Sequence, residues 1–147
     1  MSAFTIRSAG LSDGETLLRI EQECFSLPWS ADTLQEMLSS RFETVWIAFC
    51  GEEAAGFLDF REIAGEGELM RIAVRPAYRD RKLGGELMDR MLSEATKRGT
   101  KKILLEVRRG NAPAIALYTG RGFHEEAVRK DYYDKPKEDA LILRLDL

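Results

Sequence analysis

Residues 67–107 contain the pattern that most restricts the fold of this chain. The segment GELMRIAVRP (67–76) is typical of a strand that Pro76 ends, and KKILLEV (101–107) is a nearly continuous apolar strand. Between them lies an apolar stripe at helical spacing, with Gly99 as its stop: Leu83, Leu87, Met88, Met91, Leu92 and Ala95. A strand, a helix and a second apolar strand predict a parallel pair, with the second strand buried on both faces.

The rest of the chain alternates between helix and strand signals. Ser12 with Glu15 forms a capping-box pattern for one helix, and Ser30 caps another, in which Trp29 and Leu34 occupy the staple positions. The predicted helices cover residues 12–24, 30–40, 83–98 and 111–118. The predicted strands cover residues 4–9, 43–50, 54–63, 67–76, 101–107, 123–133 and 139–147. We therefore expect one α/β domain over residues 1–147, with a mixed central sheet of about six to seven strands and about four helices.

Composition narrows the classes of function. The 147 residues are 44% hydrophobic and carry a net charge of −3, which argues against general electrostatic binding to nucleic acid. Cys24 and Cys50 show no metal-binding spacing and are best interpreted as free thiols. The single histidine, His124, leaves little material for a metal site or a histidine-based triad. Because neither a signal peptide nor an apolar run of about 20 residues is found, we expect a cytoplasmic protein that does not contact the membrane.

The stretch YRDRKLGGELM (78–88) places three basic residues and two glycines at the start of a predicted helix. It is either a charged surface turn or an anion-binding loop, since the N–H groups and the dipole at a helix N-terminus attract phosphate. Two consecutive glycines weaken a helix start by about 1 kcal/mol each relative to alanine, and close approach of the backbone to a ligand offsets that loss. We interpret the stretch as a phosphate-binding loop.

The phrases IAVRPAYRDRKLGGELM and LLEVRRGNAPAIALYTGRGF resemble the two acetyl-CoA-binding segments of the GNAT N-acetyltransferases. Together with CFSLPWS and the tail KDYYDKPKEDALILRLDL, they make nearly the whole chain similar to the RimI-type ribosomal-protein-alanine N-acetyltransferases. The resemblance implies the GNAT fold, with its two central parallel strands splayed, and acetyl-CoA as the acetyl donor without a metal. The acceptor it implies is the N-terminal alanine amine of the small-subunit ribosomal protein eighteen.

The resemblance also implies roles for individual residues. Glu106 falls on the family's general base and Tyr118 on its general acid. Cofactor contacts are implied for the strand residues Ile72, Ala73 and Val74, for the loop residues Arg79, Asp80, Arg81, Lys82, Leu83, Gly84 and Gly85, and for Asn111. Substrate contacts are expected from Trp29, Arg71, Tyr132 and Tyr133.

Two positions depart from the family's pattern. Lys82 replaces the middle glycine of the loop, and Arg71 stands where asparagine is common. We expect Lys82 either to have an ordinary φ or to hold the loop slightly away from the pyrophosphate, with its ammonium able to reach a phosphate. The arginine at position 71 bears on peptide specificity.

The residue types suit the implied chemistry. Glu106 ends an apolar strand with side-chain parity opposite that of its apolar neighbours, which suits a general base and equally a solvated glutamate. Tyr118 suits a general acid, because a phenol of pKa about 10 starts protonated beside a thiol of pKa about 8.5, but it also suits a core position. Tyr132 and Tyr133 lie in a turn-like segment that could line a peptide groove.

Three functions remain open at the level of the sequence. A terminal amine, of pKa about 7.7–8.0, is easier to present neutral than a lysine of pKa about 10.4, and the gap of ~2.5 units is about 3.4 kcal/mol. We therefore expect a protein N-terminus as acceptor, and a small amine or a lysine is the alternative. A non-catalytic CoA-binding module is suggested by Lys82, while the presence of both Glu106 and Tyr118 argues against it.

Overall fold

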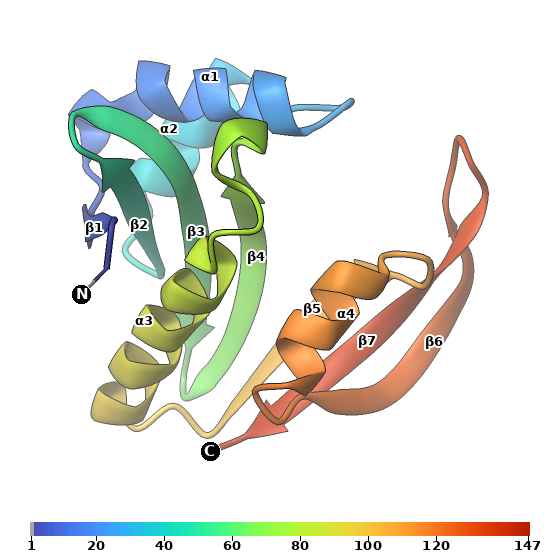
Figure 1. The fold of residues 1–147 in the computed structure, drawn as a ribbon. Helices are drawn as coiled ribbons and strands as arrows, with labels where there is room; N and C mark the ends of the chain where they lie inside the picture. Colours follow the sequence, from blue (N-terminus) through green and yellow to red (C-terminus); the bar gives the residue numbers. More distant parts are fainter. Residues whose placement is uncertain (1) are drawn as a thin grey trace. The chain divides into compact units, whose positions relative to one another are not determined.

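The computed structural model describes residues 2–147, which form seven strands and four α-helices (Figure 1). The strands are β1 (Thr5–Ser8), β2 (Glu43–Cys50), β3 (Glu53–Ile63), β4 (Glu66–Val74), β5 (Lys102–Arg108), β6 (His124–Tyr133) and β7 (Glu138–Asp146). The α-helices are α1 (Gly14–Cys24), α2 (Ala31–Ser39), α3 (Leu83–Arg98) and α4 (Ala112–Thr119), and short 3-10 turns cover Leu11–Asp13 and Pro76–Tyr78. The sheet order β1-β2-β3-β4-β5-β7-β6 confirms the predicted mixed α/β sheet.

The chain divides into two compact units that share β4. The first unit consists of the chain up to Arg61 together with Met70–Glu94, and the second of Glu62–Leu69 together with Ala95–Leu147. Antiparallel pairing joins β1 to β2 and β2 to β3 in the first unit, and β5 to β7 and β7 to β6 in the second. The site residues predicted from the sequence are therefore divided between the two units.

β4 and β5 run parallel, as predicted, with Glu66–Glu68 opposite Lys102–Leu104. The prediction that β5 is buried on both faces is wrong. Alternate residues from Ile103 to Val107 are buried, whereas Glu106 between the last two of them is exposed. β5 thus has one apolar face and one face that is available for chemistry. The splaying of the two strands beyond their paired residues stays a prediction.

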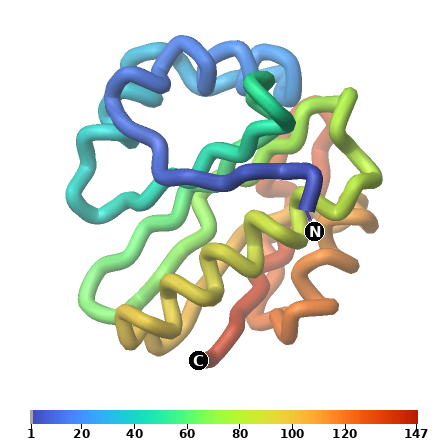
Figure 2. The backbone as a smooth tube through the Cα atoms, turned by 60° about the vertical axis from the view of Figure 1, so that its left-hand side comes forward, coloured from blue at the N-terminus to red at the C-terminus, as the bar shows by residue number. Residues whose placement is uncertain are grey.

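In the first unit, α1 and α2 cover one face of the β2–β3–β4 sheet, and α3 lies across the other (Figure 1, Figure 2). One cluster of buried side chains joins α1 and α2 to the strands: Leu17, Ile20, Leu34, Met37, Val45, Ile47, Phe57 and Ala73. Trp46, Leu58 and Phe60 alternate with the strand members of that cluster and are also buried. The sheet of this unit is therefore covered on both sides.

Helix starts agree with the sequence where a local signal decides them. Ser30 and Asn111 each accept a hydrogen bond from the N–H three residues on, and so cap α2 and α4 as predicted. The prediction that Ser12 caps the first helix is wrong, because α1 begins at Gly14 after a 3-10 turn. Arg7 pairs with Asp13 at 2.9 Å, and the Asp13 carboxylate also accepts the Gly10 N–H, which holds that turn in place.

A buried carboxyl group lies on β3, on the side-chain parity of the α1–α2 face. Asp59 is fully buried, and neither of its carboxyl oxygens forms a hydrogen bond with another described residue. Burial, together with the neighbouring Glu43 carboxyl, raises the pKa of Asp59 above its usual range. The folded state then holds a proton that the unfolded chain releases above about pH 4, so stability falls as the pH rises from there.

We expect Asp59→Asn to remove much of this pH dependence, because the amide has the shape of the carboxyl group but does not titrate. Between about pH 5 and about pH 8, the stability of the variant relative to wild type should rise by up to about 1.4 kcal/mol per pH unit. Urea unfolding at several pH values measures the difference. Glu125→Gln, which changes an exposed strand carboxylate, is the matched control. Parallel pH curves for Asp59→Asn and wild type would contradict the assignment.

Candidate active site

The carboxyl half of β4, which carries Ile72–Val74, lies in the first unit. Ala73 is buried, and the residues on either side of it are half-buried. Gly56 on β3 permits a close approach here, because a Cβ at that position would lie 2.4 Å from the Ala73 carbonyl oxygen. The strand predicted to contact the acetyl and pantetheine portion of the cofactor is therefore held tightly against its neighbour.

The loop Arg79–Lys82 leads from the 3-10 turn into α3 and is exposed. Asp80 and Lys82 both have left-handed backbone, with φ of 62° and 66°. An ordinary φ at Lys82, the first expected arrangement, is therefore wrong. Its carbonyl accepts the N–H of Glu86 at 3.1 Å, so Lys82 is the residue at which the chain turns into the helix. Turns of this kind direct successive N–H groups to one side and form anion-binding concavities.

Two basic side chains of this loop turn back onto the protein. Arg79 donates its Nε–H to the Val74 carbonyl at 3.0 Å, and the Arg81 guanidinium lies 5.7 Å from the centre of the Tyr78 ring. The Arg79 hydrogen bond is exposed, and the Arg81 side chain is exposed above the ring of the buried Tyr78. Cation–π contacts at exposed sites contribute about 0.5–1 kcal/mol, so Arg81 can move to a bound anion at a small cost in free energy.

The first turn of α3 completes the loop. The Leu83 side chain is buried, so this residue can offer a ligand only its backbone. Gly84 and Gly85 follow, without side chains that would cover the N–H groups of the first turn. These N–H groups have no acceptor within a helix and carry the positive end of its dipole. The loop and the helix start together have the features of an anion-binding site, and the assignment of this site to the pyrophosphate of acetyl-CoA stays a prediction.

Glu106 is the exposed acidic residue of β5, in the second unit. Its carboxylate lies 3.5 Å from the guanidinium of Arg129 on β6, and the two side chains are 36% and 55% exposed. Because β7 lies between β5 and β6, this ion pair spans one strand of the sheet. A solvent-accessible carboxylate that is paired with one guanidinium in this way has lone pairs left to accept a proton.

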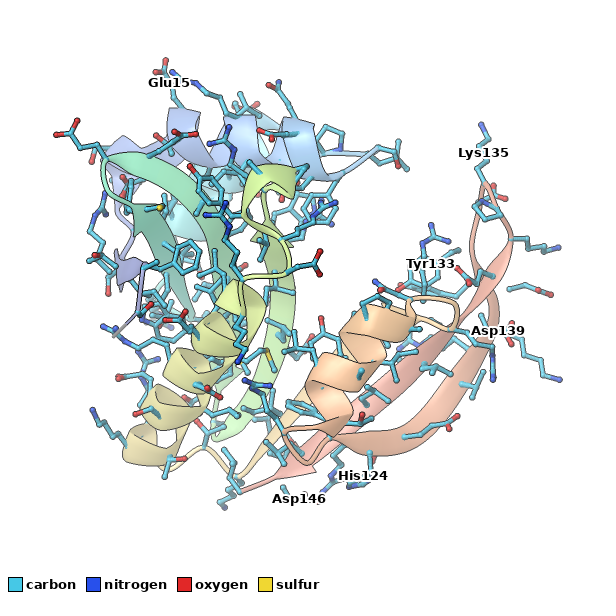
Figure 3. All side chains as sticks on the ribbon, in the orientation of Figure 1. Glu15, His124, Tyr133, Lys135, Asp139 and Asp146 are labelled. Atoms are coloured by element: carbon cyan, nitrogen blue, oxygen red, sulfur yellow. The ribbon has the colours of Figure 1, made fainter. Side chains whose placement is uncertain are left out.

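Two tyrosines and two arginines lie near Glu106. The rings of Tyr132 and Tyr133 meet edge to face at 5.2 Å. The Arg129 guanidinium lies 5.3 Å from the centre of the Tyr132 ring, and that of Arg108 lies 4.1 Å from Tyr133. Tyr133 lies toward the turn that joins β6 and β7, at the opposite end of the two strands from His124 and Asp146 (Figure 3).

Tyr118 lies on α4 and is 5% exposed, with its ring packed edge-on against Phe123. Burial, with a smaller contribution from Tyr133, raises the pKa of Tyr118 to about 12. Burial and then the charge of Glu106 raise the pKa of Tyr133. These influences place Glu106, Tyr133 and Tyr118 in one electrostatic neighbourhood of the second unit.

The remaining site residues predicted from the sequence include Asn111, Arg71 and Trp29. Asn111 is exposed, and its side chain caps α4 by accepting the Ala114 N–H at 3.3 Å. Arg71 and Trp29 are in contact in the first unit, where the guanidinium lies 4.6 Å from the indole. Sequence reasoning missed Arg129 as a partner of the candidate base, because that pairing depends on the strand order β5-β7-β6.

Two classes of site find no support in residues 2–147. No helix of this part of the chain is long and apolar enough to cross a membrane. No group of three or more histidine, cysteine or acidic side chains that could hold a metal ion occurs in the same residues. Both cysteines are free thiols, as predicted.

Comparison with known proteins identifies close relatives. Residues 14–123 match the model of the family described as the acetyltransferase (GNAT) family. The chain is 36% identical over 145 residues to the ribosomal protein bS18-alanine N-acetyltransferase of Escherichia coli strain K12, and the match covers 97% of each chain. The crystal structure of the ribosomal-protein-S18-alanine N-acetyltransferase from Escherichia coli has a TM-score of 0.93 at 34% identity, covering 97% of this chain and 93% of that one. That of Ard1 from Thermoplasma volcanium has a TM-score of 0.89 at 25% identity, covering 99% and 98%.

We expect Lys82→Gly to be at least as stable as wild type. Left-handed backbone costs a non-glycine residue about 1–2 kcal/mol, partly offset by the greater freedom of glycine in the unfolded chain. Acetyl-CoA affinity should change by less than about tenfold and depend less on salt, because an exposed ion pair is screened. Thermal unfolding and calorimetric titration at low and high salt measure both effects.

Lys82→Ala is the matched control for this variant, because it removes the ammonium and keeps the left-handed φ. It should share the weaker salt dependence and be less stable than Lys82→Gly. Binding that tightens far beyond tenfold in Lys82→Gly would instead identify lysine as an obstruction in the loop.

Proposed function

Since the chain belongs to the GNAT acetyltransferase family and is an acetyl-CoA-dependent N-acetyltransferase, we propose that it acetylates the N-terminal alanine of the ribosomal protein bS18. The observation that carries this proposal is the 36% identity, over 97% of both chains, with an enzyme named for that reaction. An acceptor on the ribosome implies a cytoplasmic enzyme.

In this proposal, residues of the first unit bind the donor. The backbone N–H groups of the loop and of the first turn of α3, from Asp80 to Gly85, bind the pyrophosphate. Arg79 adds a charge-assisted contact once its side chain leaves the Val74 carbonyl. Ile72–Val74 lie along the acetyl and pantetheine portion, where a backbone N–H polarises the thioester carbonyl.

In the reaction, the amine nitrogen attacks the thioester carbon, the C–N bond forms and the C–S bond breaks. Glu106 accepts the proton that the amine loses, directly or through one water. Tyr118 is the group proposed to assist the departing sulfur. Because its pKa of about 12 lies far above physiological pH, the phenol stays protonated and donates a hydrogen bond as charge develops on sulfur. Since that pKa also exceeds the ~8.5 of a thiol, the phenol keeps its proton, and the CoA thiolate leaves as the anion and takes a proton from solvent.

The decisive experiment incubates the protein with acetyl-CoA and a peptide that has the N-terminal sequence of bS18. We expect the mass increase of one acetyl group, which fragmentation assigns to the α-amine of the first alanine. The same peptide with a blocked N-terminus and an internal lysine should stay unmodified. Acetylation of that lysine, or of a polyamine in preference to the peptide, would favour a different acceptor class and overturn the proposal.

Glu106→Gln should reduce turnover of this peptide by on the order of 10²-fold near neutral pH, with acetyl-CoA affinity unchanged, because only the base is lost. The deficit should shrink at high pH, where the amine loses its proton unaided. Rates measured across pH, with Glu125→Gln as a control for loss of an exposed carboxylate, test this expectation. A neutral-pH rate within about twofold of wild type would remove Glu106 from the role.

Tyr118→Phe should lower kcat by about tenfold or more and leave the KM for acetyl-CoA nearly unchanged, because the hydroxyl acts as the thiolate leaves. Steady-state kinetics with both substrates varied separate the two parameters. The ring keeps its packing against Phe123, so the melting temperature should stay close to that of wild type. A large rise in KM for acetyl-CoA with unchanged kcat would show that the hydroxyl holds the cofactor instead.

A further inference from the structure

Arg71 on β4 ties that strand to the end of α1 and to the loop between α1 and α2. Its Nε and Nη2 donate to the two carboxylate oxygens of Glu21, at 2.9 and 2.6 Å. Its guanidinium also lies 3.6 Å from the centre of the Phe25 ring and 4.6 Å from that of Trp29. One side chain thus contacts a carboxylate and two aromatic rings that lie within nine residues of one another in the sequence.

Glu21 also forms a hydrogen bond with the backbone of the loop. Its side chain is 0% exposed, and one of its oxygens also accepts the Trp29 N–H at 2.7 Å. A carboxylate buried in this way requires a cation with good geometry, and the planar fork of arginine supplies it. The loop is therefore fixed near both ends, at Phe25 and at Trp29. Leu27 between them is 83% exposed.

The same geometry argues against a direct contact between Arg71 and a substrate. Two of its three nitrogens are committed to Glu21, and the side chain is 19% exposed. Arg71 immediately precedes Ile72, the first of the residues proposed to lie along the acetyl and pantetheine portion. Arg71 thus anchors the loop to β4 one residue before the segment that is proposed to contact the acetyl portion of the cofactor.

We propose that Arg71 is a positioning residue, which through Glu21 and the two rings holds residues 25–29 as a fixed wall for the acceptor peptide. This inference rests on the proposed function, because it assigns the loop to the acceptor side of the same reaction. We call the contacts of Arg71 with Glu21, Phe25 and Trp29 the clamp. Without the clamp, the loop has to become ordered each time a peptide binds. Loss of the clamp therefore raises the KM for the peptide and leaves that for acetyl-CoA unchanged.

Three variants test the clamp. Arg71→Lys keeps the charge but lacks the planar fork and the flat ring contact. The double variant Glu21→Gln/Arg71→Met removes the ion pair without leaving a buried charge. It can therefore still be measured if Arg71→Lys impairs folding. Arg75→Lys is the matched control: Arg75 directly follows β4 and pairs with Glu23 of α1 at 2.8 Å, and its guanidinium lies over the Tyr78 ring and not over either of the two loop rings.

Two measurements are made on each variant. Hydrogen exchange of the Trp29 amide, followed by NMR on the free protein, should be about tenfold faster or more in Arg71→Lys and in the double variant, and within about twofold of wild type in Arg75→Lys. In steady-state kinetics, the KM for the alanine-initiated peptide should rise about fivefold or more, and the KM for acetyl-CoA should stay within about twofold.

Each other result overturns the inference in its own way. Unchanged Trp29 exchange would show that Arg71 does not hold the loop. A higher peptide KM with unchanged exchange would make Arg71 a direct ligand, and faster exchange with an unchanged peptide KM would leave the cluster only structural. Failure of the proposed function is a separate result: wild-type protein would then not acetylate the peptide, while exchange in the free protein would still decide whether Arg71 clamps the loop.

Discussion

The parallel pairing of β4 with β5 is the constraint on which the rest of the fold depends. Parallel neighbours need a long connection, which α3 provides, so the chain has to leave β4 and turn sharply into a helix. The turn is made by Asp80 and Lys82 in left-handed backbone. The conformation that makes the crossover thus also aligns N–H groups for an anion, and the predicted phosphate loop is a consequence of topology as much as of its basic side chains.

The sequence predicted those features that depend on residues close along the chain. Ser30 and Asn111 cap helices because their acceptors meet N–H groups three residues on, whereas the Ser12 cap failed because Arg7 on β1 holds the turn before α1. Contacts set by strand order or by distant packing had no local signal. Glu21 and Arg71 lie 50 residues apart, and no pattern in either segment indicates that they meet.

Two arginine–glutamate pairs of like chemistry serve different ends because their exposure differs. The pair of Glu21 with Arg71 is buried on the carboxylate side, and breaking such a pair costs about 3–5 kcal/mol, which suits a fixed support. The pair of Glu106 with Arg129 is exposed on both sides, and pairs of this kind contribute about 0–1 kcal/mol. Breaking this pair therefore costs Glu106 little free energy, which its proposed role as a general base requires.

Burial raises the pKa of both Asp59 and Tyr118, but the consequences at neutral pH are opposite. An aspartate is ionised in the unfolded chain, so keeping it protonated in the folded state reduces stability. A phenol is neutral in both states near pH 7, so raising its pKa to about 12 leaves stability unchanged there. A buried tyrosine is therefore a hydrogen-bond donor whose protonation state does not reduce the stability of the fold near pH 7. Tyr118 therefore keeps its hydroxyl proton across the physiological range, as the proposed hydrogen bond to sulfur requires.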